Sequence, residues 1–491
     1  MPQLTEEVPP VSRQQRRAAL KAGAGAIAAL ALAGRGSIAQ AVESVAAPAN
    51  APTDTAPPAA PAADAGRQAW QNWSGIHTCR PTAIATPADE TELATVLRGT
   101  APGVRCVGSG HSFTALVPTD TTLVSLDRMS GIVSADKATG TVTLQAGTRL
   151  ALLSRLLDAQ GLAMRNLPDI DVQSFAGAIA TGTHGTGQNL PALHADVIGL
   201  RLMTPDGNVL DCSERDNPDL LAAARVSLGA LGVVTQITLR TVPAYNLHRR
   251  VFLKPVEAML EEAPALAEQH RNFEFYYLPF TGYAAGIVHD VYEGDDVLTP
   301  QPADEAMLRD LRRLRDWLGH FPKLRRWTAQ RFIDADQTEE AKNRSWKLLS
   351  TQRPTRFNET ECHVPRNVGI DCVREVIAAL EKRDDVYFPL EFRFVKADDA
   401  WLSPFHQRDS CSIAVHAAQG EPYDYLLSEI GPIYRKYEGR PHWGKLHDVG
   451  PEQLAALYPR WSDFLALRGQ LDPEGKMLNP YLRTLFGVDH G

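Results

Sequence analysis

Hydrophobic residues in the first half of the chain alternate between helix-like and strand-like spacing. Five leucines between positions 150 and 157 form one stripe, which predicts a helix over residues 150–161 that ends at Gly161. Runs rich in β-branched residues predict strands around it, including a hairpin with Gly140 in its turn. The strands are expected within residues 104–108, 121–126, 132–147, 197–203, 209–212 and 228–242. The pattern therefore predicts an α+β domain over residues 70–245.

The second half of the chain, residues 246–440, is predicted to form another α+β domain. Helical periodicity and strand-like alternation both occur there, separated by short polar segments. Helices are expected near residues 303–319, 338–350, 369–382 and 423–437, and strands at 273–278, 387–395 and 411–417.

Two glycine-rich segments each surround one histidine. They read VGSGHSF at 107–113, with His111, and GAIATGTHGTG at 177–187, with His184. Glycine lets the backbone adopt positive φ and approach a ligand, and successive amides can bind phosphate. Neither segment matches the G-x-G-x-x-G fingerprint or the GK[ST] ending of a P-loop. One such loop is more often a tight turn, but the pair predicts a cradle for a large anionic cofactor.

Composition narrows the classes of function. The formal net charge is −8, without a basic block beyond the N-terminal segment, which argues against nucleic-acid binding. The six cysteines have no C-x-x-C spacing, so structural zinc is not expected. Cys362 and Cys372 could pair in an oxidising compartment, although free buried thiols are the favoured interpretation. His442 and His447 lack a supporting cluster of other ligands, and no metal is predicted.

The N-terminal segment has the pattern of an export signal. Arg16 and Arg17 are followed by AALK and by an apolar run, 22–33, that is too short to span a bilayer comfortably. Residues 1–41 are therefore predicted to be a twin-arginine signal cleaved after Ala41, with an Ala/Pro-rich linker over 42–69. The Tat translocase would deliver the protein to the periplasm or outside the cell, without a membrane span after cleavage. The alternatives are an uncleaved signal that anchors the protein and a disordered basic tail.

Further segments carry a family resemblance together with the two glycine loops. They are VTLQAGTRL, GLAMRNLPDIDVQSF, LGALGVVTQITL, EFRF (391–394), SPFHQRDSC, GRPHWGKLH (439–447) and LDPEGKMLNPYL. Over residues 73–486 the sequence resembles the aldonolactone oxidoreductases (gulonolactone, arabinonolactone and galactonolactone enzymes) of the vanillyl-alcohol oxidase / p-cresol methylhydroxylase superfamily. The resemblance implies a two-lobed FAD-binding domain over 70–245, a substrate cap over 246–440, and return of 441–491 to the FAD domain.

The EFRF segment carries the predicted substrate chemistry. Side chains alternate along a strand, so Glu391 and Arg393 share one face while the neighbouring Leu and Phe residues face the other side. A carboxylate beside a guanidinium offers hydrogen-bond acceptors and planar donors to a polyol. The resemblance implies that this pair binds substrate and assists deprotonation of its hydroxyl. The alternative is an ordinary exposed ion pair on a half-buried strand.

Other residues gain roles only through the resemblance. It puts Lys445 near the N1–C2=O edge of the flavin, where a cation stabilises the reduced ring; the alternative is a solvated lysine. It implies a covalent bond from His111 to the flavin 8α-methyl, whereas His184 is expected to order its own loop. His111 and Pro168 are both typical of the family's oxidases. Asp171 lies at a position where polar groups can face the substrate in relatives, but the alignment there is too loose to assign it a role.

FAD is the cofactor that the resemblance implies, bound by residues in and near both loops. The assigned residues are Val107, Gly108, Ser109, Gly110, His111, Ser112, Pro168, Gly177, Thr181, Gly182, Thr183, His184, Gly185, Gly232, Val233 and Lys445.

The expected reaction is oxidation of a sugar-1,4-lactone or related polyol, with hydride transfer to flavin N5 and reoxidation by O2 to H2O2. One alternative is the same oxidation with a cytochrome or quinone acceptor. Another is a non-catalytic, flavin-containing sugar binder.

Replacing Arg16 and Arg17 together by Lys should keep the protein in the cytoplasm, because the twin-arginine pathway requires that pair. The exported wild-type chain should begin at or near Val42. Immunoblots of periplasmic fractions and N-terminal sequencing would check both expectations, and normal export of the Lys–Lys variant would refute the hypothesis.

Overall fold

A computed structural model describes residues 68–299, 306–336, 338–351 and 355–488. Helices make up 31% and strands 28% of the structure, which confirms the predicted α+β class. The predicted signal 1–41, and all but the last two residues of the linker 42–69, lie outside the described residues. No helix in the described part is long and apolar enough to cross a bilayer.

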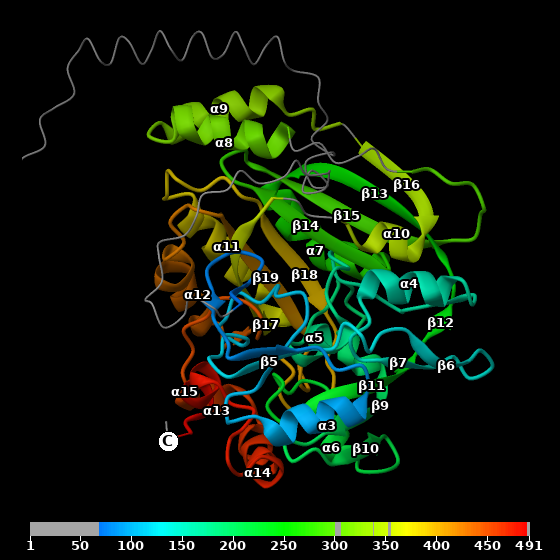
Figure 1. The fold of residues 1–491 in the computed structure, drawn as a ribbon. Coiled ribbons are helices and arrows are strands. Elements are labelled where there is room, and N and C mark those ends of the chain that lie inside the picture. The colour runs from blue at the N-terminus through cyan, green and yellow to red at the C-terminus, as the bar shows by residue number, and fades with distance from the viewer. Residues whose placement is uncertain (1–67, 300–305, 337, 352–354, 489–491) are drawn as a thin grey trace, which may run out of the picture.

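The first half of the chain folds around two main sheets (Figure 1). In the parallel sheet, β5 (Thr122–Ser125) lies between β3 (Ala83–Ala85) and β4 (Arg105–Val107). The antiparallel sheet has the order β10 (Val209–Ser213), β9 (Val197–Met203), β11 (Val233–Arg240), β7 (Thr141–Gln145) and β6 (Ile132–Asp136). Helices α3 (Glu90–Gly99), α4 (Leu150–Asp158), α5 (Phe175–Ala180) and α6 (Pro218–Ala224) accompany these sheets. Apart from β3, which was not predicted, the strands of these two sheets and α4 fall where the hydrophobic pattern predicts them.

The second half of the chain builds one eight-stranded sheet. Its order is β16 (Thr338–Arg344), β13 (Asn246–Pro255), β15 (Tyr283–Tyr292), β14 (Asn272–Leu278), β18 (Leu390–Val395), β19 (Ser410–Ala418), β17 (Phe357–Pro365) and β20 (Arg440–Pro441). Helices α7 (Val256–Gln269) and α11 (Gly369–Leu380) share a hydrophobic core with the aromatic residues of β14 and β18. The opposite side chains of the same strands are therefore left for polar contacts.

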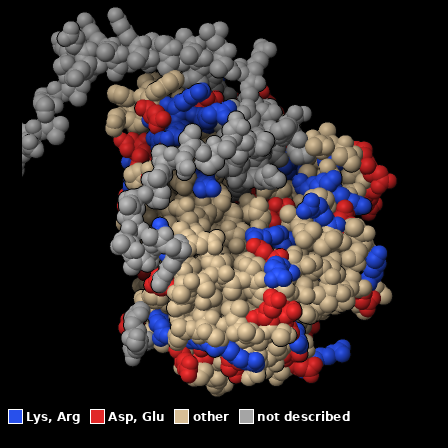
Figure 2. Space-filling model, viewed as in Figure 1, with Lys and Arg blue, Asp and Glu red and all other residues tan. Residues whose placement is uncertain are grey.

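Two helices lie at the top of Figure 1, α8 (Ala306–Leu318) and α9 (Pro322–Phe332). Leu308 and Leu311 of α8 share a hydrophobic cluster with residues of β17 and β19. Both helices are rich in arginine, and Figure 2 shows Lys and Arg side chains gathered over them. Helix α8 agrees with the prediction near 303–319, and α9 was not predicted.

One predicted helix is wrong. Residues 338–350 form the edge strand β16 followed by the short helix α10 (Ser345–Leu349). Residues Thr338–Arg344 have no apolar stripe for a helix to bury, and β16 instead pairs in register with β13. The backbone hydrogen bonds of that edge outweigh the local preference for a helix.

Three long strands of the eight-stranded sheet were not predicted, and in two of them charged residues occupy buried positions. In β13, Arg249 takes an inward position of the alternating pattern and pairs with Glu339 of β16. In β17, Glu359, Glu361 and His363 are all buried. Strand prediction from the spacing of apolar residues misses such strands. In β17 the buried polar residues are the ones nearest the candidate site. The third missed strand, β15, lies between β13 and β14.

The C-terminal helices α13 (Pro451–Leu457), α14 (Trp461–Leu471) and α15 (Pro480–Phe486) share a hydrophobic core with the first half of the chain. The buried Arg105 guanidinium reinforces this arrangement. It donates hydrogen bonds to the carbonyls of Leu116 (2.7 Å), Leu228 (2.6 Å) and Met477 (2.6 Å). Segments far apart in sequence are thus held around one side chain.

Backbone hydrogen bonds bring the two glycine loops against later segments of the chain. Gly187 N–H donates to the Phe394 carbonyl at 2.8 Å, which sets the second loop against the end of β18. Phe113 N–H donates to the Gly444 carbonyl at 2.7 Å, which sets the first loop against the HWGK segment. The four segments with candidate chemistry therefore converge.

Candidate active site

A cavity of about 730 Å³ lies where these four segments meet. Its volume falls within the ~300–1,000 Å³ typical of small-molecule and cofactor sites. The three residues predicted to act in catalysis, Glu391, Arg393 and Lys445, all line it. The tertiary fold thus brings together groups that are far apart in the sequence.

The residues predicted to bind the cofactor mostly line the same cavity. The lining residues among them are Val107, Gly108, Ser109, Gly110, His111, Ser112, Pro168, Gly177, Thr181, Thr183, His184, Gly232, Val233 and Lys445. Gly182 and Gly185 do not line it. Gly182 has φ +80°, and a Cβ on Gly185 would lie 2.3 Å from the Leu167 carbonyl oxygen. These two glycines shape the loop, because its backbone turns and packs where a side chain would not fit.

Polar groups along the cavity wall fit an anionic, hydrogen-bonding cofactor. Among the described residues, the backbone amides of residues 109–112 have no hydrogen-bond acceptor within the protein. The side-chain oxygen of Gln173, which lines the same cavity, is buried without a hydrogen-bond partner. Unpaired donors in a glycine-rich loop suit phosphate oxygens, and a buried unpaired carbonyl calls for a donor.

His111 lies on the cavity wall beneath an aromatic side chain. The Trp73 ring stacks on the imidazole, with centroids 4.9 Å apart and planes inclined by 24°. Burial, followed by the positive charges of Lys445 and Arg149, lowers the pKa of His111 to about 4. The imidazole is therefore neutral at physiological pH, and a ring nitrogen keeps its lone pair.

Arg393 is the centre of a buried ionic cluster. Its guanidinium forms ion pairs with Asp169, with Glu391 and, at 2.5 Å, with Glu274. Burial alone would lower the pKa of Arg393, but these three carboxylates hold it well above its usual value. Glu391 and Arg393 are 5% and 7% exposed, so the alternative of an ordinary exposed pair is wrong.

Two members of this cluster were missed from the sequence. Glu274 of β14 lies directly opposite Arg393 of β18 in the antiparallel register. Asp169 comes from the segment before the second glycine loop and accepts a hydrogen bond from the Tyr276 hydroxyl at 2.9 Å. Glu274 had one available signal, since it is the only charged residue in the strand NFEFYYL. Asp171, two residues further along, does not line the cavity.

Lys445 lies beside two buried carboxylates of β17. Its ammonium pairs with Glu359 and lies 3.9 Å from a carboxylate oxygen of Glu361. Burial alone would raise the pKa of Glu359, but Lys445 and then His416 lower it below its usual range. The side chain of Lys445 is 22% exposed, so it is held in place rather than freely solvated. Neither glutamate was predicted from the sequence.

His184 joins the second glycine loop to β17. One ring nitrogen, Nδ1, lies 2.8 Å from the Gly185 carbonyl oxygen within its own loop. The other, Nε2, lies 2.9 Å from a carboxylate oxygen of Glu361. The ring therefore orders its loop as expected, and it also connects that loop to the sheet.

The remaining histidines and cysteines of the predictions have further contacts. The His442 backbone N–H donates to the Glu361 carbonyl at 3.0 Å. His442 lines the cavity and accepts a hydrogen bond from Gly444 N–H at 3.0 Å. His447 lies 3.2 Å from the Tyr481 hydroxyl. Cys362 and Cys372 are both buried free thiols, which agrees with the favoured interpretation over a disulfide.

Comparison with known proteins gives two family matches. Residues 81–213 match the FAD binding domain, and residues 237–485 match D-arabinono-1,4-lactone oxidase. A solved structure of a solvent-stable cholesterol oxidase aligns with a TM-score of 0.68 at 17% identity, covering 86% of this chain and 97% of that one. This last likeness concerns the fold alone.

Curated relatives match nearly end to end. L-gulono-1,4-lactone dehydrogenase of Mycobacterium tuberculosis is 36% identical over 428 residues, covering 85% of this chain and 99% of the relative. L-gulonolactone oxidase of Mus musculus is 32% identical over 435 residues, covering 85% and 98%. Alditol oxidase of a Streptomyces species is 30% identical over 436 residues, covering 84% and 98%.

The fold, the cavity and these matches define a FAD-dependent oxidoreductase acting on CH–OH donors. Within that class, the chain belongs to the D-arabinono-1,4-lactone oxidase family.

Proposed function

We propose that this protein oxidises a secondary hydroxyl of a sugar-1,4-lactone of the arabinono- or gulono-lactone type. The observation that carries the proposal is the pair Glu391–Arg393 on the wall of the cavity that both glycine loops also line. The names of the relatives support a lactone as substrate. FAD, when bound, supplies the electron acceptor for the oxidation.

Arg393, Glu391 and Lys445 have different roles in the proposed reaction because their charges differ. Arg393 is fixed by three carboxylates and offers planar donors to the oxygens of a polyol. Glu391 lines the cavity and has the oxygen acceptors needed to take up the hydroxyl proton. Lys445 contributes a positive charge to the wall nearer His111, where it favours negative charge on the bound cofactor.

For the electron acceptor we propose dioxygen, with hydrogen peroxide as the product. His111 and Pro168 are typical of the oxidases of the family that the sequence resembles. A cytochrome or quinone acceptor is the second candidate, because the Mycobacterium tuberculosis relative is named a dehydrogenase. Export through the twin-arginine pathway, as the sequence predicts, remains part of this proposal.

Aldonolactones should reduce the flavin of the purified protein anaerobically, and faster than alditols of the same carbon number. In air, one H2O2 should form per lactone oxidised. Stopped-flow absorbance and a peroxidase-coupled assay would measure both quantities. Reduction without peroxide would favour the cytochrome or quinone acceptor, and no reduction by any lactone or alditol would favour a non-catalytic binder.

Glu391→Gln should slow flavin reduction by the best substrate by a factor on the order of 10²–10⁴, the range for positioned acid–base groups. The matched control is Glu274→Gln, which removes a similar charge from beside Arg393 but does not lie on the cavity wall. It should slow reduction far less. Equal rates for Glu391→Gln and wild type in stopped-flow experiments would mean that the EFRF pair is structural.

We further propose that FAD is covalently attached to His111, whose neutral imidazole lines the cavity. Acid-precipitated wild-type protein should then stay yellow, whereas precipitated His111→Ala should release its flavin. His248→Ala, a change at a half-buried histidine of β13 outside the cavity, should behave as wild type. Absorbance of the washed pellets measures the outcome, and a colourless wild-type pellet would rule out the bond.

A further inference from the structure

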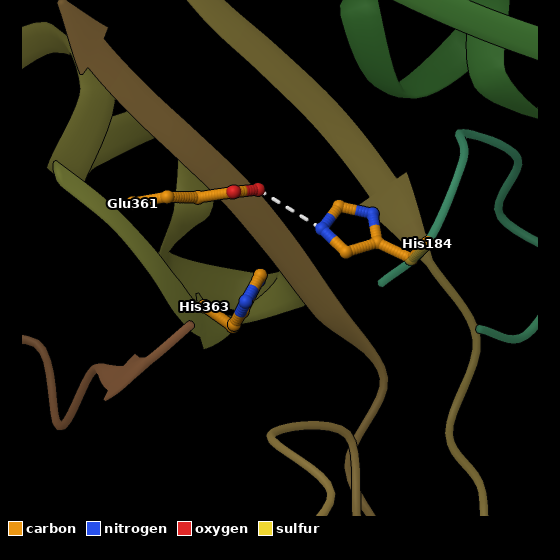
Figure 3. A group of neighbouring side chains, drawn as sticks. All are labelled: His184, Glu361 and His363. Atoms are coloured by element: carbon orange, nitrogen blue, oxygen red, sulfur yellow. Dashed lines mark hydrogen bonds and ion pairs between the residues drawn. The ribbon is translucent and has the colours of Figure 1, made fainter. Parts of the chain in front are cut away.

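We propose that His184, Glu361 and His363 form a binding site for one divalent transition-metal ion, between the second glycine loop and β17. This site is separate from the Glu391–Arg393 cluster and does not depend on the identity of the substrate. Figure 3 shows Glu361 and His363 extending from the same strand toward His184. One potential ligand atom from each residue lies within 4.8 Å of the other two, and all three residues are buried.

Strand geometry explains why two of these ligands converge. Glu361 and His363 are two residues apart on β17 and therefore face the same side of the sheet. The Gly187–Phe394 hydrogen bond fixes the second loop against the neighbouring part of the same sheet, which brings His184 to that face. The site thus rests on backbone contacts that are independent of any ion.

His363 is the residue that most strongly indicates a ligand at this site. Its side chain is 0% exposed, and neither ring nitrogen has a hydrogen-bond partner among the described residues. Its ring packs edge-on against His184 and Phe405 and lies tilted against His442. Buried imidazoles normally satisfy their nitrogens, and one without a partner calls for an explanation such as an ion.

The contacts of His184 lead to the same conclusion. The Gly185 carbonyl can only accept, so Nδ1 carries a hydrogen and donates to it. Nε2 lies 2.9 Å from the Glu361 carboxylate oxygen, which can also only accept, so a metal ion would take the place of the hydrogen between these two atoms. A backbone carbonyl bonded to one imidazole nitrogen is also the usual arrangement that orients the other toward a metal.

Glu361 supplies the oxygen ligand of the site. The Ser412 hydroxyl donates to the same carboxylate, and Lys445 lies 3.9 Å from it. His442 is not a further ligand through Nδ1, which already accepts the Gly444 N–H.

Two imidazoles and one carboxylate suit zinc and its first-row neighbours better than calcium or magnesium, which prefer oxygen. Three protein ligands leave a coordination position open. Binding would form metal–nitrogen bonds to His184 and His363 and a metal–oxygen bond to Glu361. Where His184 Nε2 carries a proton, its N–H bond breaks and the proton goes to solvent.

The test uses full-length, FAD-loaded protein treated with chelator and then titrated with Zn²⁺ or Co²⁺. We expect one ion per chain, with release of about one proton, since metal binding displaces protons from its ligands. Isothermal calorimetry in two buffers of different ionisation enthalpy measures the stoichiometry, the affinity and the released proton. Cobalt absorption bands at wavelengths beyond the flavin spectrum report the coordination directly.

His363→Phe should weaken zinc binding by about 100-fold or more, because loss of an outer partner alone already costs about 10- to 100-fold. His363→Gln provides a milder second variant if the first fails to fold. The matched control is His289→Phe, a change at another buried histidine of the same sheet that lies outside the cluster, and it should bind zinc as wild type does. Absence of stoichiometric binding to wild type, or equal affinities for wild type and the His363 variants, would overturn the proposal.

Discussion

The buried guanidinium of Arg393 is the interaction on which the arrangement of the site depends. It compensates three carboxylates that come from the segment before the second glycine loop, from β14 and from β18. Removing one partner from a single buried pair costs about 3–5 kcal/mol, because the other charge stays buried and unpaired. Here one cation serves three such charges, one of them from the first half of the chain, so Arg393 also links the two halves of the chain at the cavity.

A second ionic cluster occupies another part of the cavity wall. Two carboxylates, Glu359 and Glu361, share the ammonium of Lys445 and the polar groups of His184 and Ser412. The first cluster has one cation among three carboxylates, and the second has two carboxylates beside one lysine. Each cluster therefore places a carboxylate next to a cation on the cavity wall.

The proposed metal site would draw on this second cluster. An ion at Glu361 would compete with Lys445 and His184 for the same carboxylate, while Glu359 would still pair with Lys445. Metal binding and the position of the Lys445 charge are consequently coupled through a single side chain. This coupling follows from the strand register, since Glu359 and Glu361 lie on the same face of β17.

Local sequence patterns predicted many of the secondary-structure elements and most residues of the site. Apolar periodicity predicted α4 and most strands of the first half, and EFRF predicted the Glu391–Arg393 pair, because alternation along a strand is a local property. In contrast, it is the folded chain that makes Asp169 and Glu274 share Arg393 and that pairs Glu359 and Glu361 with Lys445. Those contacts depend on strand register and on the Gly187–Phe394 hydrogen bond. Burying a carboxylate costs free energy unless a partner compensates its charge, and here those partners are distant in the sequence. The sequence alone therefore could not reveal these buried acids.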